Sequence, residues 1–248
     1  MVTTRLQAQS RACRAKPVRR RAARRKVPSC DTETRIHALE AALAKRIDAA
    51  AHKSRFSDGR LGSVEAEATV IAAIKAVLKG RASVFVPPAR SWYDVSVRWP
   101  ECKAPVYFNI KVSVGGRDNA FNKKAVVLSL SALQEADIPN AMSLNKMHDL
   151  IIENVRTTRD PYDYHYIYVD KKDGTVIVRS ISDIQAWTPN PHNLLQINWA
   201  KEKKAPACRR RRRNTQLAPV RDKLFRTLAT SVDKYIASCD RILKYSMV

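Results

Sequence analysis

The chain has 248 residues, and its 46 Lys and Arg residues against 23 Asp and Glu residues give a formal net charge of +23. A hydrophobic content of 45% allows one sizeable core, but no apolar run approaches the ~20 residues that a membrane span requires. Such a positive excess predicts binding to a polyanion, usually nucleic acid, and says nothing about sequence preference, because phosphate contacts position a protein without reading bases.

Two segments carry a dense positive charge. Residues 1–28 hold the first set, and a second basic run extends from Arg209 to Arg213. We expect residues 1–30 to be a basic disordered tail, which is compatible with DNA affinity. The N-terminus lacks the apolar stretch of a secretory signal. We therefore expect a cytoplasmic protein, bacterial or virus-encoded, and the basic tail leaves a nuclear location as an alternative.

Five cysteines are scattered along the chain, and none forms a CxxC or a Cys/His cluster with zinc spacing. We expect free thiols in a reducing compartment rather than a disulfide or zinc framework. The cysteines are Cys13, Cys30, Cys102, Cys208 and Cys239.

The first ordered elements are expected to be two helices and a strand. Asp31 or Thr32 can cap a helix over residues 35–51. Residues 64–78 have the composition of a second helix, and residues 82–86 predict a strand that ends at a pair of prolines.

A hairpin with two charged side chains follows. Residues 93–97 and 108–112 alternate polar and apolar side chains, as half-buried strands do, and residues 100–105 predict the turn between them. Asp94 and Lys111 would then lie on adjacent strands. A carboxylate there can hold a hard cation, and the ammonium can orient water or offset phosphate charge. This is the layout of a metal-dependent phosphodiesterase.

The second half of the chain predicts more helices and another hairpin. A loop over residues 115–119 leaves the strand of Lys111, and Lys171-Lys172-Asp173-Gly174 has the chemistry of a hairpin turn. Alternate tyrosines at positions 162, 164, 166 and 168 indicate one face of a half-exposed sheet. The expected elements are helices over residues 120–133, 143–155 and 219–244, strands over 164–169 and 175–180, and a short apolar segment over 194–199.

This order of elements predicts an α/β fold, with a mixed central β-sheet flanked by helices and a long C-terminal helix. We expect a single catalytic and DNA-binding domain over residues 31–248. The helix over residues 64–78 carries Glu65 and Glu67, and either glutamate could project a carboxylate toward the charged hairpin.

Asp94, followed by Asn109-Ile110-Lys111, resembles the PD-(D/E)xK motif of type II restriction endonucleases, most closely their EcoRV/HincII-like branch. The resemblance implies a restriction-endonuclease-like fold, Mg²⁺ as cofactor and sequence-specific hydrolysis of double-stranded DNA to 5′-phosphate ends. It implies that Asp94 is a metal ligand, that Asn109 is at the second ligand position, and that Lys111 is the catalytic lysine that assists the attacking water. In that branch a glutamate on an earlier helix can complete the catalytic metal site, and Glu67 matches better than Glu65.

The resemblance extends patchily over residues 55–245, and residues 115–122 fall where that branch carries its DNA-reading loop. The resemblance implies that the asparagines of this segment approach base edges, while its basic side chains contact phosphates. Phe121 fits either a core position or a wedge between bases. The implied DNA-binding residues are Arg117, Asn119, Ala120, Phe121, Asn122, Lys123 and Lys124.

Asn109 departs from the family pattern, which has an acid at this position. Its side-chain oxygen can ligate a metal but is neutral, so a cation held by Asp94 with amide and backbone oxygens should bind more weakly. Either another acid compensates and the protein is active, or the chain is a binding-only relative that lost catalysis. The presence of both Asp94 and Lys111 favours activity.

Three functions therefore stay open. The first is a type II restriction enzyme that acts as a homodimer on a palindromic site, with a cognate DNA methyltransferase in the host. The second is a non-enzymatic basic protein that binds or packages DNA. The third is a structure-selective DNA nuclease on the same fold. None of the three has a membrane partner.

Overall fold

The computed structural model describes most of the chain between residues 31 and 205. The described residues are 31–47, 59–115, 119–120, 122–139, 141–154, 162–189, 196–205, 224–227, 229–230 and 233. The expected basic tail and the run from Arg209 to Arg213 lie outside them. Most of the expected C-terminal helix at 219–244 does so too, and its described residues are helical.

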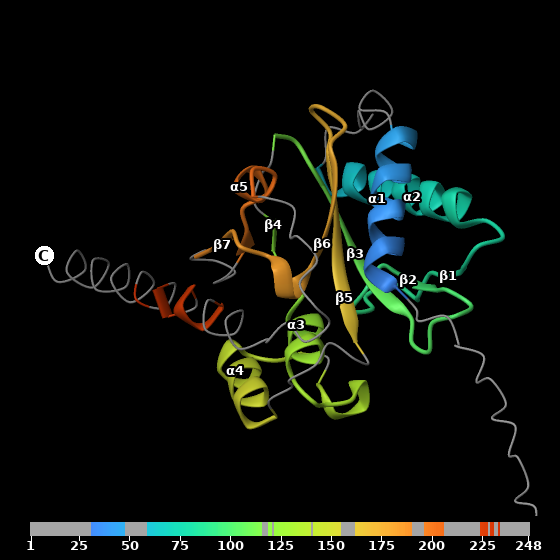
Figure 1. The fold of residues 1–248 in the computed structure, drawn as a ribbon. Coiled ribbons are helices and arrows are strands. Elements are labelled where there is room, and N and C mark those ends of the chain that lie inside the picture. Colours follow the sequence, from blue (N-terminus) through green and yellow to red (C-terminus); the bar gives the residue numbers. More distant parts are fainter. Residues whose placement is uncertain are drawn as a thin grey trace, which may run out of the picture.

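Helices α1 (Thr32–Arg46) and α2 (Gly59–Leu78) form one layer of the fold (Figure 1). As predicted, Asp31 caps α1, because its carboxylate accepts a hydrogen bond from the backbone N–H of Thr34 at 3.1 Å. The expectation of helix up to residue 51 is wrong within the described residues, since the backbone is already extended at Ile47. The start of α2 at Gly59 is earlier than predicted.

The predicted mixed central sheet is confirmed, with strand order β1-β2-β3-β5-β6. Strands β3 and β5 pair in parallel, and each other neighbouring pair is antiparallel. The two predicted hairpins are β2–β3 and β5–β6. The strand bounds are β1 Ser83–Phe85, β2 Val95–Arg98, β3 Val106–Ser113, β5 Asp163–Asp170 and β6 Val176–Ser180.

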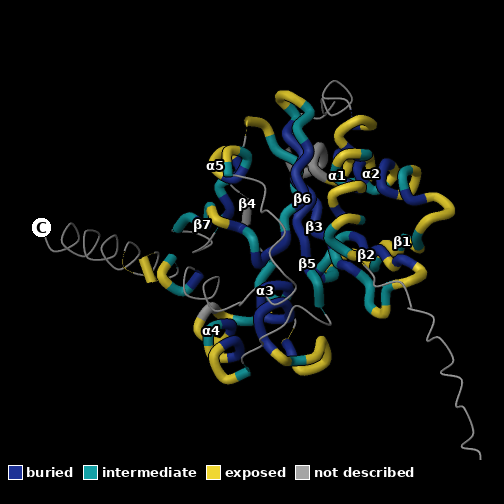
Figure 2. The backbone as a smooth tube through the Cα atoms, viewed as in Figure 1, coloured by how far each residue is buried: buried dark blue, intermediate teal, exposed yellow. Residues whose placement is uncertain are grey.

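Two hydrophobic cores cover the two faces of this sheet. The first joins α1 and α2 to alternate residues of β3, including Phe108 and Ile110. The second contains Tyr164, Tyr166 and Tyr168 of β5, which are fully buried (Figure 2). The expectation of a half-exposed tyrosine face is therefore wrong, because both faces of β5 are covered.

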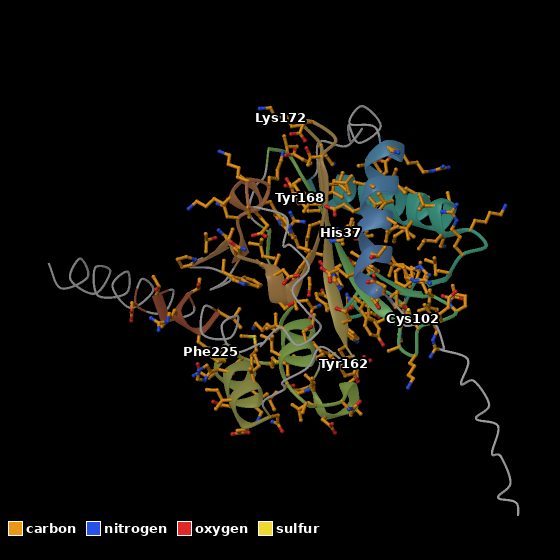
Figure 3. All side chains as sticks on the ribbon, viewed as in Figure 1. His37, Cys102, Tyr162, Tyr168, Lys172 and Phe225 are labelled. Atoms are coloured by element: carbon orange, nitrogen blue, oxygen red, sulfur yellow. The ribbon has the colours of Figure 1, made fainter. Side chains whose placement is uncertain are left out.

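Elements from the second half of the chain cover the tyrosine face. Helices α3 (Lys123–Leu130) and α4 (Leu144–Glu153) supply buried side chains to this core, as does α5 (Trp199–Glu202). Phe225 contacts the ring of His148 on α4 at a centroid distance of 4.6 Å (Figure 3). The remaining strands form a short sheet of order β4-β8-β7. Its strands are β4 Asn119–Ala120, β7 Trp187–Thr188 and β8 Gln196–Ile197. There are also two described 3-10 helices, η2 Glu135–Asp137 and η3 Ile181–Asp183.

One prediction on this side of the sheet is corrected. The helix expected over residues 120–133 is shorter, because Asn122 caps α3 and Asn119–Ala120 form strand β4. The expected apolar segment over 194–199 contains β8 and the first residue of α5. The helix expected over 143–155 is present as α4, with Ser143 as its N-cap.

Cys102, which is labelled in Figure 3, lies in the turn between β2 and β3. Its thiol is disulfide-bonded. This contradicts the expectation of free thiols, which rested on cysteine spacing alone. Among the described residues, no helix is both long and apolar enough to cross a membrane.

Candidate functional site

Asp94 lies one residue before β2 and is tied to β3 on both sides of Asn109. Its backbone N–H donates to the carbonyl of Phe108 at 2.9 Å, and its carboxylate accepts from the N–H of Ile110 at 2.6 Å. The carboxylate is part-buried, and burial raises its pKa despite the Ile110 hydrogen bond and the nearby Lys111 charge, which lower it. The predicted hairpin thus places Asp94 beside the strand that carries Lys111.

Lys111 lies on β3 two residues beyond Asn109, on the same side of the strand. Burial lowers the pKa of its ammonium below the ordinary value of 10.5, and the charges of Asp94 and Glu67 oppose this shift. A buried lysine with a lowered pKa can serve as a proton acceptor more readily than a solvated one.

Glu67 of α2 is the third charged member of the site. Burial raises the pKa of its carboxyl, Asp94 raises it further, and Lys111 lowers it. Glu67 is therefore close enough to Asp94 and Lys111 for their charges to act on its carboxyl. The helix that carries it packs against β3. Glu65, the other sequence candidate, is exposed. The structure therefore brings Glu67, rather than Glu65, to Asp94 and Lys111.

Asn109 contributes an unsatisfied oxygen to this group. The residue is 6% exposed, and its side-chain oxygen is buried with no hydrogen-bond partner. A buried carbonyl oxygen of this kind costs about 1–3 kcal/mol unless something occupies its lone pairs. A hard cation is one such partner, since amide and carboxylate oxygens are the ligands that Mg²⁺ and Ca²⁺ prefer.

The oxygens available to a cation are those of Asp94, Glu67 and Asn109. Within the part of the chain that the structure describes, no group of three or more His, Cys, Asp or Glu residues is placed to hold a metal ion. The set is therefore two carboxylates and one amide, which fits a hard divalent ion with the remaining positions left to water or phosphate.

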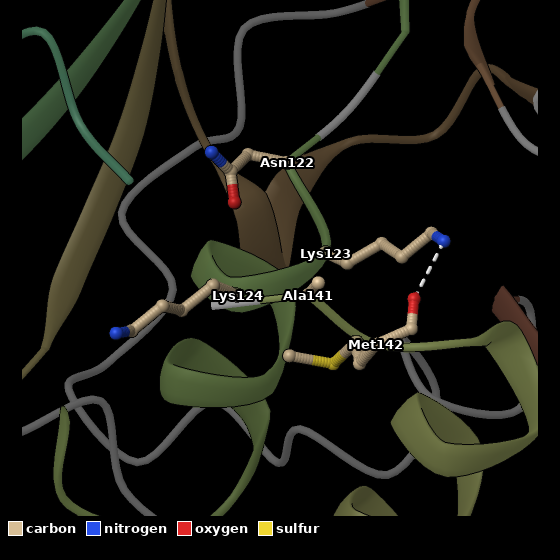
Figure 4. A pocket seen from close by; sticks show the side chains of 5 residues that line it. All are labelled: Asn122, Lys123, Lys124, Ala141 and Met142. Carbon is tan, nitrogen blue, oxygen red and sulfur yellow. Dashed lines mark hydrogen bonds between the residues drawn. The ribbon is translucent and has the colours of Figure 1, made fainter. Parts of the chain in front are cut away.

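The last residues of the segment predicted to contact DNA form the start of α3 and line a pocket of about 370 Å³ (Figure 4). The pocket is lined by Asn122, Lys123, Lys124, Ala141 and Met142. Asn122 uses its side-chain oxygen to cap α3, accepting from the N–H of Ala125 at 3.2 Å. The side chains of Lys123 and Lys124 extend in opposite directions.

Both lysines of this segment have protein partners. Lys123 donates to the carbonyl of Met142 at 2.8 Å, and Lys124 lies 3.7 Å from the carboxylate of Glu135. Arg117 and Phe121 lie outside the described residues, while Asn119 and Ala120 are described as strand β4, paired with β8. Of this segment, the structure thus describes strand β4 and the first residues at the start of α3.

Tyr166 belongs to the site but was not found by sequence reasoning. It is the partner of Asn109 in the parallel β3–β5 register. Burial and the charge of Asp94 both raise the pKa of its hydroxyl. The tyrosine repeat was visible in the sequence, but no local signal could reveal that β5 pairs with β3, since the pairing is long-range.

Comparison with protein-family models finds no family that matches the chain, and comparison with curated proteins finds no relative.

Proposed function

We propose that this protein is a divalent-cation-dependent endonuclease of double-stranded DNA, related to type II restriction enzymes. One observation carries the proposal. The charges of Asp94 and Lys111 both act on the pKa of Glu67, those of Asp94 and Glu67 act on the pKa of Lys111, and the unsatisfied oxygen of Asn109 lies on the same strand as Lys111. Two acids, a neutral oxygen and a lysine with lowered pKa are groups that can support metal-assisted phosphodiester hydrolysis.

In the proposed mechanism, Asp94, Glu67 and Asn109 would hold Mg²⁺. When bound, the ion would neutralise phosphate charge and favour formation of a nucleophile near neutral pH. Lys111 orients the attacking water and accepts its proton at Nζ. In-line attack on phosphorus would then break the bond to the 3′-oxygen, which takes up a proton from solvent, and leave 5′-phosphate and 3′-hydroxyl ends. The Ile110 hydrogen bond keeps the Asp94 carboxylate fixed relative to Lys111.

Asn109 supports a weakly bound cation rather than an absent one. Replacing an acid with an amide removes one negative charge but preserves an oxygen ligand. Glu67 supplies the compensating acid in the proposed site. Specific DNA binding by residues 117–124, a homodimer on a palindromic target and a cognate methyltransferase in the host belong to the same proposal.

A second candidate is a non-enzymatic DNA-binding protein, favoured by the net charge of +23 and by the two basic segments. It predicts binding that weakens steeply with salt, has little sequence preference and needs no metal. Truncation of residues 1–28 should then abolish most affinity.

The deciding experiment is digestion of a mixed-sequence linear DNA with the full chain and Mg²⁺, followed by sequencing of the ends. Wild type should give discrete fragments with 5′-phosphates, while Asp94→Ala and Lys111→Ala should not. Lys75→Ala, which removes an exposed lysine of α2, is the matched control and should cut normally. Failure of wild type to cut any sequence, or cutting by Lys111→Ala at the wild-type rate, would overturn the nuclease proposal.

A further inference from the structure

The hydroxyl of Tyr166 is a second unsatisfied oxygen at the candidate site. Tyr166 is 0% exposed, and its hydroxyl is buried without a partner at hydrogen-bond geometry. The neighbouring side chain of Tyr164 lowers the pKa of the Tyr166 hydroxyl. However, Tyr164 donates instead to the carbonyl of Trp92, at 3.5 Å.

Tyr166 and Asn109 are direct neighbours across the sheet. They are register partners in the parallel β3–β5 pair, so their side chains project from the same face. Among the residues that the structure describes, the two buried side-chain oxygens without partners thus come from adjacent positions on adjacent strands. Leaving two such groups unsatisfied is costly in a folded protein, and one hydrated cation beside them would satisfy both.

Asp94 links this pair to the acidic part of the site. Burial, followed by the charge of Asp94, raises the pKa of the Tyr166 hydroxyl. A tyrosine hydroxyl, with an ordinary pKa of 10.0, is protonated at neutral pH and can donate a hydrogen bond. Because tyrosine is longer than asparagine, its hydroxyl extends farther from the sheet than the Asn109 amide.

We propose that Tyr166 is a positioning residue of the cation site, whose hydroxyl donates a hydrogen bond to an oxygen in the shell of the ion held by Asp94 and Asn109. This inference rests on the proposed function, since it requires the same cation. Groups that hydrogen-bond to ligand oxygens orient them, and their removal typically weakens metal binding by about 10- to 100-fold.

The test uses Tyr166→Phe, which keeps the ring and removes only the hydroxyl. Tyr168→Phe is the matched control, because its hydroxyl is hydrogen-bonded to Ser113 at 3.1 Å and its ring stacks on Trp199. Thermal unfolding of the full-length proteins without metal and calorimetric titration with Mn²⁺, both without DNA, measure stability and cation affinity separately.

We expect Tyr166→Phe to unfold at the wild-type temperature or a few degrees higher without metal, because it removes an unsatisfied buried group. Its Mn²⁺ affinity should fall about tenfold. Tyr168→Phe should show the reverse pattern, with a lower unfolding temperature and unchanged Mn²⁺ affinity.

One result would overturn the role of Tyr166 and leave the proposed nuclease intact, namely wild-type Mn²⁺ affinity in Tyr166→Phe. If the metal-free stability of that variant also fell as far as that of Tyr168→Phe, the hydroxyl would be purely structural. In contrast, the cation site itself would be overturned if wild type failed to bind Mn²⁺, or if Asp94→Ala still bound it.

Discussion

The carboxylate of Asp94 accepts a hydrogen bond from the backbone N–H of Ile110 at 2.6 Å. A side chain thus occupies a backbone donor of β3 immediately before Lys111. Bonds to a charged acceptor are about twice as strong as neutral ones, so this contact holds the acid in place before any ligand arrives. The geometry between acid and lysine is therefore a property of the sheet rather than of a mobile loop.

Lys111 should control the pH dependence of cleavage. Since its pKa is lowered by burial, the neutral amine that can accept a proton becomes populated below the ordinary value of 10.5. The rate at saturating DNA should therefore rise with pH and level off below that value. Lys111→Arg, which stays charged, should lose this rise and cut about 100-fold more slowly. Single-turnover rates across pH test this, and the same pH profile in the variant would contradict it.

Glu67→Gln should stabilise the protein without metal at neutral pH. The pKa of Glu67 is raised above its ordinary value of 4.5 by burial and by Asp94, so its ionised form is disfavoured by folding. The resulting loss of stability is absent below pH 4.5 and grows as pH rises through the folded-state pKa. Denaturant unfolding at acidic and neutral pH measures the effect, with exposed Glu65→Gln as control. A variant less stable than wild type at neutral pH would contradict this.

Asn109→Asp should exchange stability for cation affinity. A third carboxylate near Asp94 and Glu67 adds like-charge repulsion in a buried position, so the metal-free protein should unfold more easily. Added ligand charge should tighten Mg²⁺ binding by about tenfold. Unfolding with and without Mg²⁺ tests both parts, and Asn145→Asp at an exposed position of α4 is the matched control. Unchanged Mg²⁺ affinity would argue against Asn109 as a ligand.

Lys203→Met should weaken the end of the sheet from which the proposed DNA-binding segment departs. Lys203 donates to Asp170 at 2.8 Å and to Asp173 at 2.7 Å, while Asp170 also accepts from the N–H of Gly115. Asp170 is 0% exposed, and loss of its cationic partner should cost about 3 kcal/mol of unfolding free energy.

The same lysine should also account for part of the acid denaturation. Burial would raise the pKa of Asp170, but the hydrogen bond from Lys203, with those from two backbone N–H groups, outweighs burial and lowers it. Lys203 also helps lower the pKa of Asp173 from 3.8 to about 2. The stability from these pairs is present above their ordinary pKa and lost as pH falls toward 2. Wild type should therefore lose more unfolding free energy than Lys203→Met over this range, and equal losses would contradict the assignment.

Local chemistry explains which parts of the fold the sequence could predict. The Asp31 cap and the hairpin turn before Gly174, whose φ is +69°, depend on neighbouring residues alone. The Asp94/Lys111 hairpin could also be predicted, because both strands alternate and the turn between them is short. These signals extend over a few residues and need no knowledge of distant segments.

The rest depends on contacts between distant segments. Burial of Tyr166 follows from the parallel pairing of β5 with β3 and from the helices packed over it, and alternation alone cannot separate one covered face from two. The choice of Glu67 over Glu65 likewise follows from the face of α2 that meets β3. Asn122 has the chemistry of a helix cap, but the helix was expected to begin two residues earlier, at Ala120.

The pairing of Val106 with Asp163 also sets when the site can be completed as the chain is synthesised. Glu67, Asp94 and Lys111 all leave the ribosome before β5, and parallel strands that are far apart in sequence are slow to pair. Until β5 docks, Asn109 has no neighbouring strand on that side and its amide faces water. A nascent chain therefore carries every charged group of the proposed nuclease before the strand beside Asn109 is in place, so cutting should begin only after β5 has been synthesised and has docked.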